Sequence, residues 1–82
     1  MYLDEVKTIL IEVLSLGEAG QRLTADSPLL GALPELDSMA VVSLIGAVEE
    51  QFDIQVDDDD ISASTFETLG SLTDFVARKR AL

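Results

Sequence analysis

The sequence predicts an all-α fold: a small bundle of three longer helices and one short helix, with a long ordered loop between helices 1 and 2. Two observations carry this prediction. Apolar side chains recur at helical spacing within 3–16, 38–52 and 69–80, and no segment shows the strict alternation of a half-buried strand. A length of 82 residues limits the chain to one small domain, 1–82, with a single modest core.

The first predicted helix covers 3–16. Asp4 and Glu5 lie in its first turn, where the helix dipole favours anions, and Gly17 is predicted to end it. Its apolar side chains form one stripe: Leu3, Val6, Ile9, Leu10, Val13, Leu14 and Leu16.

Residues 17–37 are predicted to form a long loop, since glycine and proline recur along them. Because leucines also recur, we expect the loop to be pinned to the helices, and a loop of this length is often functional. These leucines are Leu23, Leu29, Leu30, Leu33 and Leu36.

The second predicted helix covers 38–52, with Asp37 or Ser38 as its N-cap, both good capping types. Met39 and Val42 broaden the apolar surface of its start, and no charged residue follows Asp37 for three turns. A helix start with so few polar side chains indicates that the helix is buried on more than one side or that it presents a surface to a partner. The core stripe of this helix is Val41, Leu44, Ile45, Val48 and Phe52.

Beyond this helix, the acidic run Asp57–Asp60 leads to a short third helix predicted over 61–67 and anchored by Ile61 and Phe66. Thr68 is a good N-cap for a final helix at about 69–80. Arg78, Lys79 and Arg80 lie in its last turn, where the dipole favours cations. The apolar stripe of this last helix is Leu69, Leu72, Phe75 and Val76.

The composition excludes several functions. Five Lys and Arg face 16 Asp and Glu, a formal charge of −11, so neither nucleic acid nor an anionic membrane surface is expected as a partner. A basic protein surface is the natural counterpart, and the alternative is that the charge only keeps the domain soluble.

No cysteine or histidine is present, which excludes disulfides, thiolate or histidine metal sites and a Ser-His-Asp triad. No run is long enough to span a membrane and the N-terminus lacks a basic signal region, so we expect a cytoplasmic protein.

Ser38 has three readings. It could cap the helix, which is the commonest reason for a serine at this position. As a hydrolytic nucleophile it lacks a base, because Lys7 and Lys79 are far away in the sequence. As a covalent attachment point it fits well: a helix N-terminus tolerates a phosphate ester, and Asp37 could hold a divalent cation against an incoming pyrophosphate donor.

Two acidic features have structural and functional readings. Asp57–Asp60 lacks the ligand spacing of an EF-hand, so a solvated helix start is the simpler reading and a weak divalent site the alternative. Glu49 and Glu50 could dock basic partners or simply be solvated. Their negative charge near a helix C-terminus is slightly unfavourable, a local conflict that a binding surface can produce.

Several segments together resemble the acyl carrier proteins, the phosphopantetheine-bearing carriers of fatty-acid, polyketide and peptide synthesis, over nearly the whole chain. Asp37-Ser38-Met39 is similar to the family's Asp-Ser-Leu, and 47–52 to its Ala-Leu-Glu-Glu-x-Phe. Further matching segments are Asp26-Ser27-Pro28-Leu29, Ile54 through Asp60, Thr68-Leu69 and Phe75-Val76.

The resemblance implies that Ser38 carries 4'-phosphopantetheine, installed from coenzyme A by a carrier-protein synthase, with Mg²⁺ needed only in that step. The arm's thiol then holds acyl cargo as a thioester. It also implies a monomeric carrier rather than an enzyme. Its partners would be an acyl-loading ligase or transferase and a ketosynthase or acyltransferase with basic patches. Asp37, Glu49 and Glu50 would face those patches, with Met39 and Val42 adding apolar contacts, and a cavity between the helices would shelter the cargo.

Two departures from the family pattern point to a dedicated pathway. Leu36 stands where the family often has Gly, and residues 40–43 lack the acidic side chains common there. Docking near Ser38 is therefore expected to be more apolar than usual, which favours a fatty-acid, polyketide-like or other specialised pathway with its own enzymes. The alternatives are an aminoacyl or peptidyl carrier loaded by an adenylating enzyme, and an unmodified acidic helical interaction domain.

Overall fold

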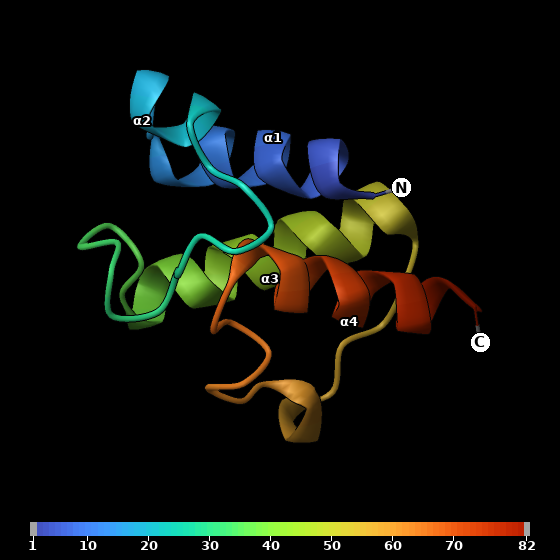
Figure 1. Ribbon diagram of the computed structural model, residues 1–82. Helices are drawn as coiled ribbons and strands as arrows, with labels where there is room; N and C mark the ends of the chain where they lie inside the picture. Colours follow the sequence, from blue (N-terminus) through green and yellow to red (C-terminus); the bar gives the residue numbers. More distant parts are fainter. Residues whose placement is uncertain (1, 82) are drawn as a thin grey trace.

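A computed structural model describes residues 2–81. Its elements are α1 (Leu3–Leu14), α2 (Glu18–Gln21), α3 (Ser38–Phe52), the 3₁₀ turn η1 (Asp58–Asp60) and α4 (Leu69–Ala81). The helices α3 and α4 lie side by side and run in the same general direction, while α1 packs against both and runs the opposite way (Figure 1). The predicted helical bundle is confirmed. Its final helix begins where predicted and ends one residue beyond the predicted 69–80.

The core lies where the three longer helices meet. Leu10, Leu44 and Leu69 come from α1, α3 and α4, and none of them reaches solvent. Leu29 is also fully buried, although it belongs to the long loop. The predicted stripes are therefore the packed faces of the helices, and the loop contributes to the core as expected.

The first and third helices end in the same way. Ser15 and Asp53 adopt the left-handed conformation, with φ of 53° and 54°. The next residue then donates back into the last turn: the Leu16 N–H donates to the Ile11 carbonyl at 3.1 Å, and Ile54 ends α3 by the same arrangement. The prediction of a helix to Leu16 was two residues too long, because Leu16 leaves the helix to reach the core.

The long loop between α1 and α3 is ordered, as predicted, by hydrogen bonds to the segment that enters α4. The N–H groups of Leu29 and Leu30 donate to the carbonyls of Glu67 and Phe66, and the Gly70 N–H donates to the Ala25 carbonyl at 2.8 Å. The sequence did not predict α2 inside this loop. Gly20 of α2 is buried against Ile11 of α1. With only four residues, α2 is too short to show an apolar stripe in the sequence.

The short helix predicted over 61–67 is wrong. The helical turn lies earlier, at Asp58–Asp60; 61–67 contains no helix, and turns cover only 63–66. Hydroxyl groups compete with the helix here, because Thr65 donates to the Asp60 carbonyl and Ser62 accepts from the Thr65 N–H. Phe66 anchors the segment in the core as expected, whereas Ile61 is 39% exposed and is not part of the core.

The start of α4 has the cap that the sequence predicts. The Thr68 hydroxyl accepts from the Ser71 N–H, and the Ser71 hydroxyl accepts from the Thr68 N–H, both at 3.0 Å. This reciprocal arrangement is a capping box with serine in the place of the usual glutamate. It fixes the point at which the loop segment 61–67 gives way to α4.

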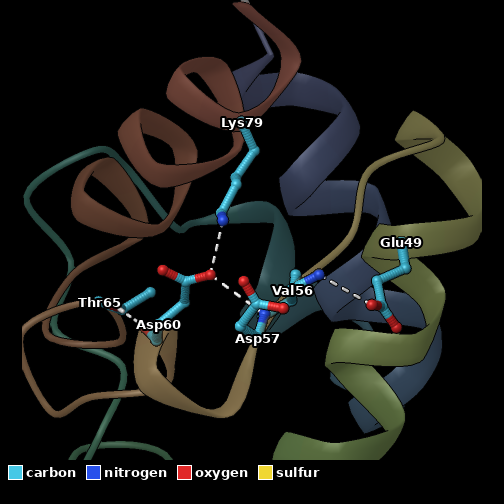
Figure 2. A network of polar contacts seen from close by, with 6 residues as sticks. All are labelled: Glu49, Val56, Asp57, Asp60, Thr65 and Lys79. Carbon is cyan, nitrogen blue, oxygen red and sulfur yellow. Dashed lines mark hydrogen bonds and ion pairs between the residues drawn. The ribbon is translucent and has the colours of Figure 1, made fainter. Parts of the chain in front are cut away.

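An ion pair connects η1 to α4 (Figure 2). The Lys79 ammonium donates to Asp60 Oδ2 at 2.6 Å, and the Asp57 N–H donates to the same oxygen. These contacts, the lysine first, hold the pKa of Asp60 below its usual 3.8 and raise the pKa of Lys79 above its usual 10.5. Since both side chains are partly exposed, the pair is screened by solvent and adds only modestly to stability.

The ion pair predicts a change in acid stability. A lowered Asp60 pKa stabilises the fold above about pH 4, and this contribution disappears as the pH falls through the folded-state pKa. The raised Lys79 pKa implies a second loss at strongly alkaline pH. We expect Asp60→Asn to lower the Tm at neutral pH relative to Asp59→Asn, which removes the same charge from an exposed neighbour. The gap, measured by circular dichroism, should close below about pH 4; a gap that stays constant would contradict the expectation.

Candidate functional site

Ser38 is the first residue of α3, at the point where the long loop enters the helix. Asp37 precedes it in extended conformation and is the N-cap, because its Oδ1 accepts a hydrogen bond from the Ala40 N–H at 2.8 Å. The choice that the sequence left open between Asp37 and Ser38 is therefore settled. Leu36 is buried and anchors the loop just before the site.

The Ser38 side chain is exposed and, within residues 2–81, takes part in no hydrogen bond. It lies at the positive end of a 15-residue helix, where unpaired N–H groups favour a negatively charged ester. The amine of Lys7 donates to the Gln21 carbonyl, and that of Lys79 is paired with Asp60. Neither lysine is therefore free to activate Ser38 as a hydrolytic nucleophile, whereas the exposed hydroxyl of Ser38 fits a covalently attached prosthetic group.

The apolar residues after Ser38 lie on the outside of the molecule. Met39 is 75% exposed and Val42 is 66% exposed, while Leu44 and Val48 of the same helix are buried. Exposure of two large apolar side chains next to an exposed serine fits a surface that meets another protein. Their role in docking remains a prediction.

Glu49 and Glu50 differ in their surroundings, although the sequence treats them as a pair. Glu50 is exposed, whereas Glu49 is partly buried and its Oε2 accepts a hydrogen bond from the Val56 N–H at 2.9 Å (Figure 2). Glu49 therefore ties the segment after α3 back to the helix. Sequence analysis missed this contact, because nothing in the spacing of a helical Glu and a later backbone N–H marks it.

This difference leads to a prediction about stability. We expect Glu49→Ala to lower the free energy of unfolding by about 1–2 kcal/mol, because a charged acceptor is lost and a partly buried N–H is left unpaired. Glu50→Ala is the matched control and is expected to change it by less than about 0.5 kcal/mol. Urea denaturation followed by circular dichroism measures both, and equal effects would contradict a tethering role for Glu49.

The acidic run was also considered as a weak divalent site. Among the described residues, no three acidic side chains gather closely enough to hold an ion. Asp60 is paired with Lys79, and its Oδ2 also accepts a hydrogen bond from the Asp57 N–H at the start of η1. Nor does any helix in residues 2–81 have both the length and the apolarity needed to cross a membrane.

Fold and site together define a small helical carrier with one exposed serine at the start of a helix. Comparison with known proteins agrees with this class. The model of the family described as "Phosphopantetheine attachment site" matches residues 4–76. The chain is also similar to a holo acyl carrier protein from Nitrosomonas europaea, solved by solution NMR, with 60% identity and a TM-score of 0.93, covering 100% of this chain and 99% of that one.

The chain belongs to the acyl carrier protein family. It is a carrier protein rather than an enzyme, and its prosthetic group is covalently bound 4'-phosphopantetheine. The sequence-based expectations of family, fold class and cofactor are thereby confirmed. An unmodified interaction domain, which the sequence left open, does not agree with this membership.

Proposed function

We propose that Ser38 is the attachment residue and that the protein carries acyl intermediates for a dedicated biosynthetic pathway. The observation that carries the proposal is the division of roles at the start of α3: Asp37 makes the cap, and the Ser38 hydroxyl is exposed and has no hydrogen-bond partner within residues 2–81. If the Ser38 hydroxyl made the capping hydrogen bond, modification of that hydroxyl would disturb the start of the helix. Because Asp37 makes this hydrogen bond, Ser38 can be modified without loss of the cap.

The chain's own residues position the reacting hydroxyl. The cap made by Asp37 fixes the first turn of α3, and Leu36 anchors the preceding loop in the core, so Ser38 is held at a defined point on the surface. A carrier-protein synthase using Mg²⁺ would join Ser38 Oγ to the phosphopantetheine half of coenzyme A, with the nucleotide half leaving. Once attached, the arm supplies the thiol that a cysteine-free chain lacks, and cargo is held there as a thioester. The tether raises the effective concentration of cargo at each partner.

For partner docking we propose a surface formed by Met39, Val42 and Glu50, all exposed on α3. Asp37 and Glu49 also belong to the predicted partner surface, but each has a carboxylate oxygen engaged with the backbone. They are therefore expected to contribute through residual charge rather than through a dedicated contact. An apolar patch beside Ser38 with acidic flanks suits enzymes whose docking sites combine apolar and basic side chains.

The pathway follows from this surface as a proposal. No acidic residue lies in the first turn of α3, so recognition near Ser38 depends on shape and apolar contact more than on charge. This favours dedicated partners: a loading ligase or transferase and a ketosynthase or acyltransferase. We further propose that residues 1–82 act as one monomeric carrier domain. The cytoplasmic location expected from the sequence remains a prediction.

Intact-protein mass spectrometry tests the attachment. The unmodified protein is incubated with a broad-specificity carrier-protein synthase, coenzyme A and Mg²⁺. We expect a gain of one phosphopantetheinyl group, located by peptide mapping on the peptide that contains Ser38. A wild-type protein that gains no mass, or gains it on another peptide, would overturn the proposal.

A further inference from the structure

Residues 53–60, the strap, follow α3 and are held differently from the loop between α1 and α3. Within the described chain, backbone hydrogen bonds join the strap only to α3 and to itself, as when the Ile54 N–H donates to the Glu49 carbonyl. The loop between α1 and α3 is tied by backbone hydrogen bonds to the start of α4, as at Gly70. The strap therefore depends on side chains for its attachment to the rest of the fold.

Two neighbouring cations of α4 hold the two ends of the strap. The Arg80 guanidinium donates to the carbonyl of Phe52, the last residue of α3, at 2.7 Å. Lys79 pairs with Asp60 at the other end (Figure 2). A carbonyl at a helix C-terminus has no partner inside the helix, so a nearby cation satisfies both its hydrogen bond and the helix dipole.

A third charged side chain holds the middle of the strap. Glu49 Oε2 accepts a hydrogen bond from the Val56 N–H at 2.9 Å. Ile54 and Val56 are only half-buried against the core, and Gln55 between them is exposed. Each of these three contacts involves an ionised side chain, whereas the apolar burial of the strap is partial.

Salt is expected to act in opposite directions on the strap and on the fold as a whole. A formal charge of −11 repels itself, and salt screens this repulsion, which stabilises the compact chain. The same screening weakens the contacts of the strap, because the Lys79 and Asp60 side chains are 17% and 28% exposed. The sign of the salt response therefore distinguishes opening of the strap from unfolding of the bundle.

We propose that the last turn of α4 is a charge-dependent clamp, and that the strap opens as a unit while the three longer helices stay folded. Opening breaks the three contacts together, since they fix parts of one short segment. It exposes the apolar faces of Ile54 and Val56 at the end of α3 opposite to Ser38, and a rise in ionic strength favours it. The clamp does not depend on the attachment proposed at Ser38.

Hydrogen exchange, measured for each amide by NMR on the unmodified protein, tests the clamp. Spectra are compared at about 0.05 M and about 0.5 M NaCl, which shortens the screening length roughly threefold. In high salt, the protection of the Val56 and Asp57 N–H groups should fall about twofold or more. The protection of the Leu29 and Gly70 N–H groups should rise, because their partners are backbone carbonyls and they follow the stability of the bundle.

Methionine variants identify the clamp residues, because methionine has a similar helix propensity but neither the charge nor the donor. We expect Arg80→Met to lower the protection of the strap amides about tenfold, since a hydrogen bond to a charged group is lost. Lys79→Met should lower it about twofold to fivefold, because this pair is partly exposed. Arg78→Met is the matched control: it removes the same charge from the same turn, and the Arg78 side chain makes no hydrogen bond or ion pair within residues 2–81.

Every outcome supports or overturns the proposal. A loss of protection confined to the strap in the Lys79 and Arg80 variants, with opposite salt responses of strap and loop, supports it. An equal loss at strap and loop amides overturns it, since the contacts then hold the whole fold. An Arg78→Met protein with the same loss as Arg80→Met overturns it as well, and so does a salt response of one sign at both sets of amides. No result depends on Ser38, whose test is the gain of mass.

Discussion

Replacing Ser38 by alanine is expected to abolish transfer of phosphopantetheine to the protein while leaving the fold intact. No other exposed hydroxyl lies at the start of α3, and the one at Ser38 makes no hydrogen bond within the described chain. Because Asp37 provides the cap, the free energy of unfolding should change by less than about 0.5 kcal/mol. Intact mass and urea denaturation on the same sample measure both expectations.

Ser43→Ala is the matched control for this experiment, since Ser43 is the other serine of α3 and is also exposed. It should be modified as completely as the wild type. If the Ser38→Ala protein still gains mass, the attachment site lies elsewhere. If it unfolds at much lower urea concentration, Ser38 contributes to the helix start in a way that the capping hydrogen bond of Asp37 does not explain.

Truncating Leu44 is expected to have the largest effect on stability. Leu44 comes from the middle of α3, is fully buried, and lies where this helix packs against α1 and α4. Its replacement by alanine removes several buried carbon atoms and leaves a cavity, which costs about 3–5 kcal/mol. A domain of this length has roughly 4–12 kcal/mol in total, so the variant should be close to unfolding at moderate temperature.

Val42→Ala on the same helix provides the comparison for Leu44→Ala. Val42 is mostly exposed, so its truncation removes little buried surface and should change stability by less than about 0.5 kcal/mol. Urea denaturation followed by circular dichroism suits both variants, because the chain contains no tryptophan. A loss below about 1 kcal/mol for Leu44→Ala would mean that the core collapses around the missing side chain.

The three longer helices could be predicted because each has a strong apolar stripe and clear end signals. Asp37 and Thr68 mark the helix starts, and the stripes named by spacing are the faces that pack together. The short elements were the ones missed. The helix α2 has too few residues for a stripe, and η1 depends on bonds such as Thr65 to the Asp60 carbonyl, which only the folded chain brings together.

The candidate site could be predicted in part. A serine after an aspartate at a helix start, in a chain with no histidine, indicated a modified residue rather than a catalytic one. The different situations of Glu49 and Glu50 could not be predicted, because two neighbouring glutamates look alike until the chain after α3 turns back toward one of them.

The capping bond at Asp37 has a consequence for the life of the protein in the cell. Asp37 makes the cap of α3, so attachment at the proposed residue, Ser38, does not require the cap to be released. We therefore expect the chain to fold without coenzyme A and to be loaded afterwards without refolding. An enzyme that must distinguish the loaded form from the unloaded one is then expected to sense the arm itself.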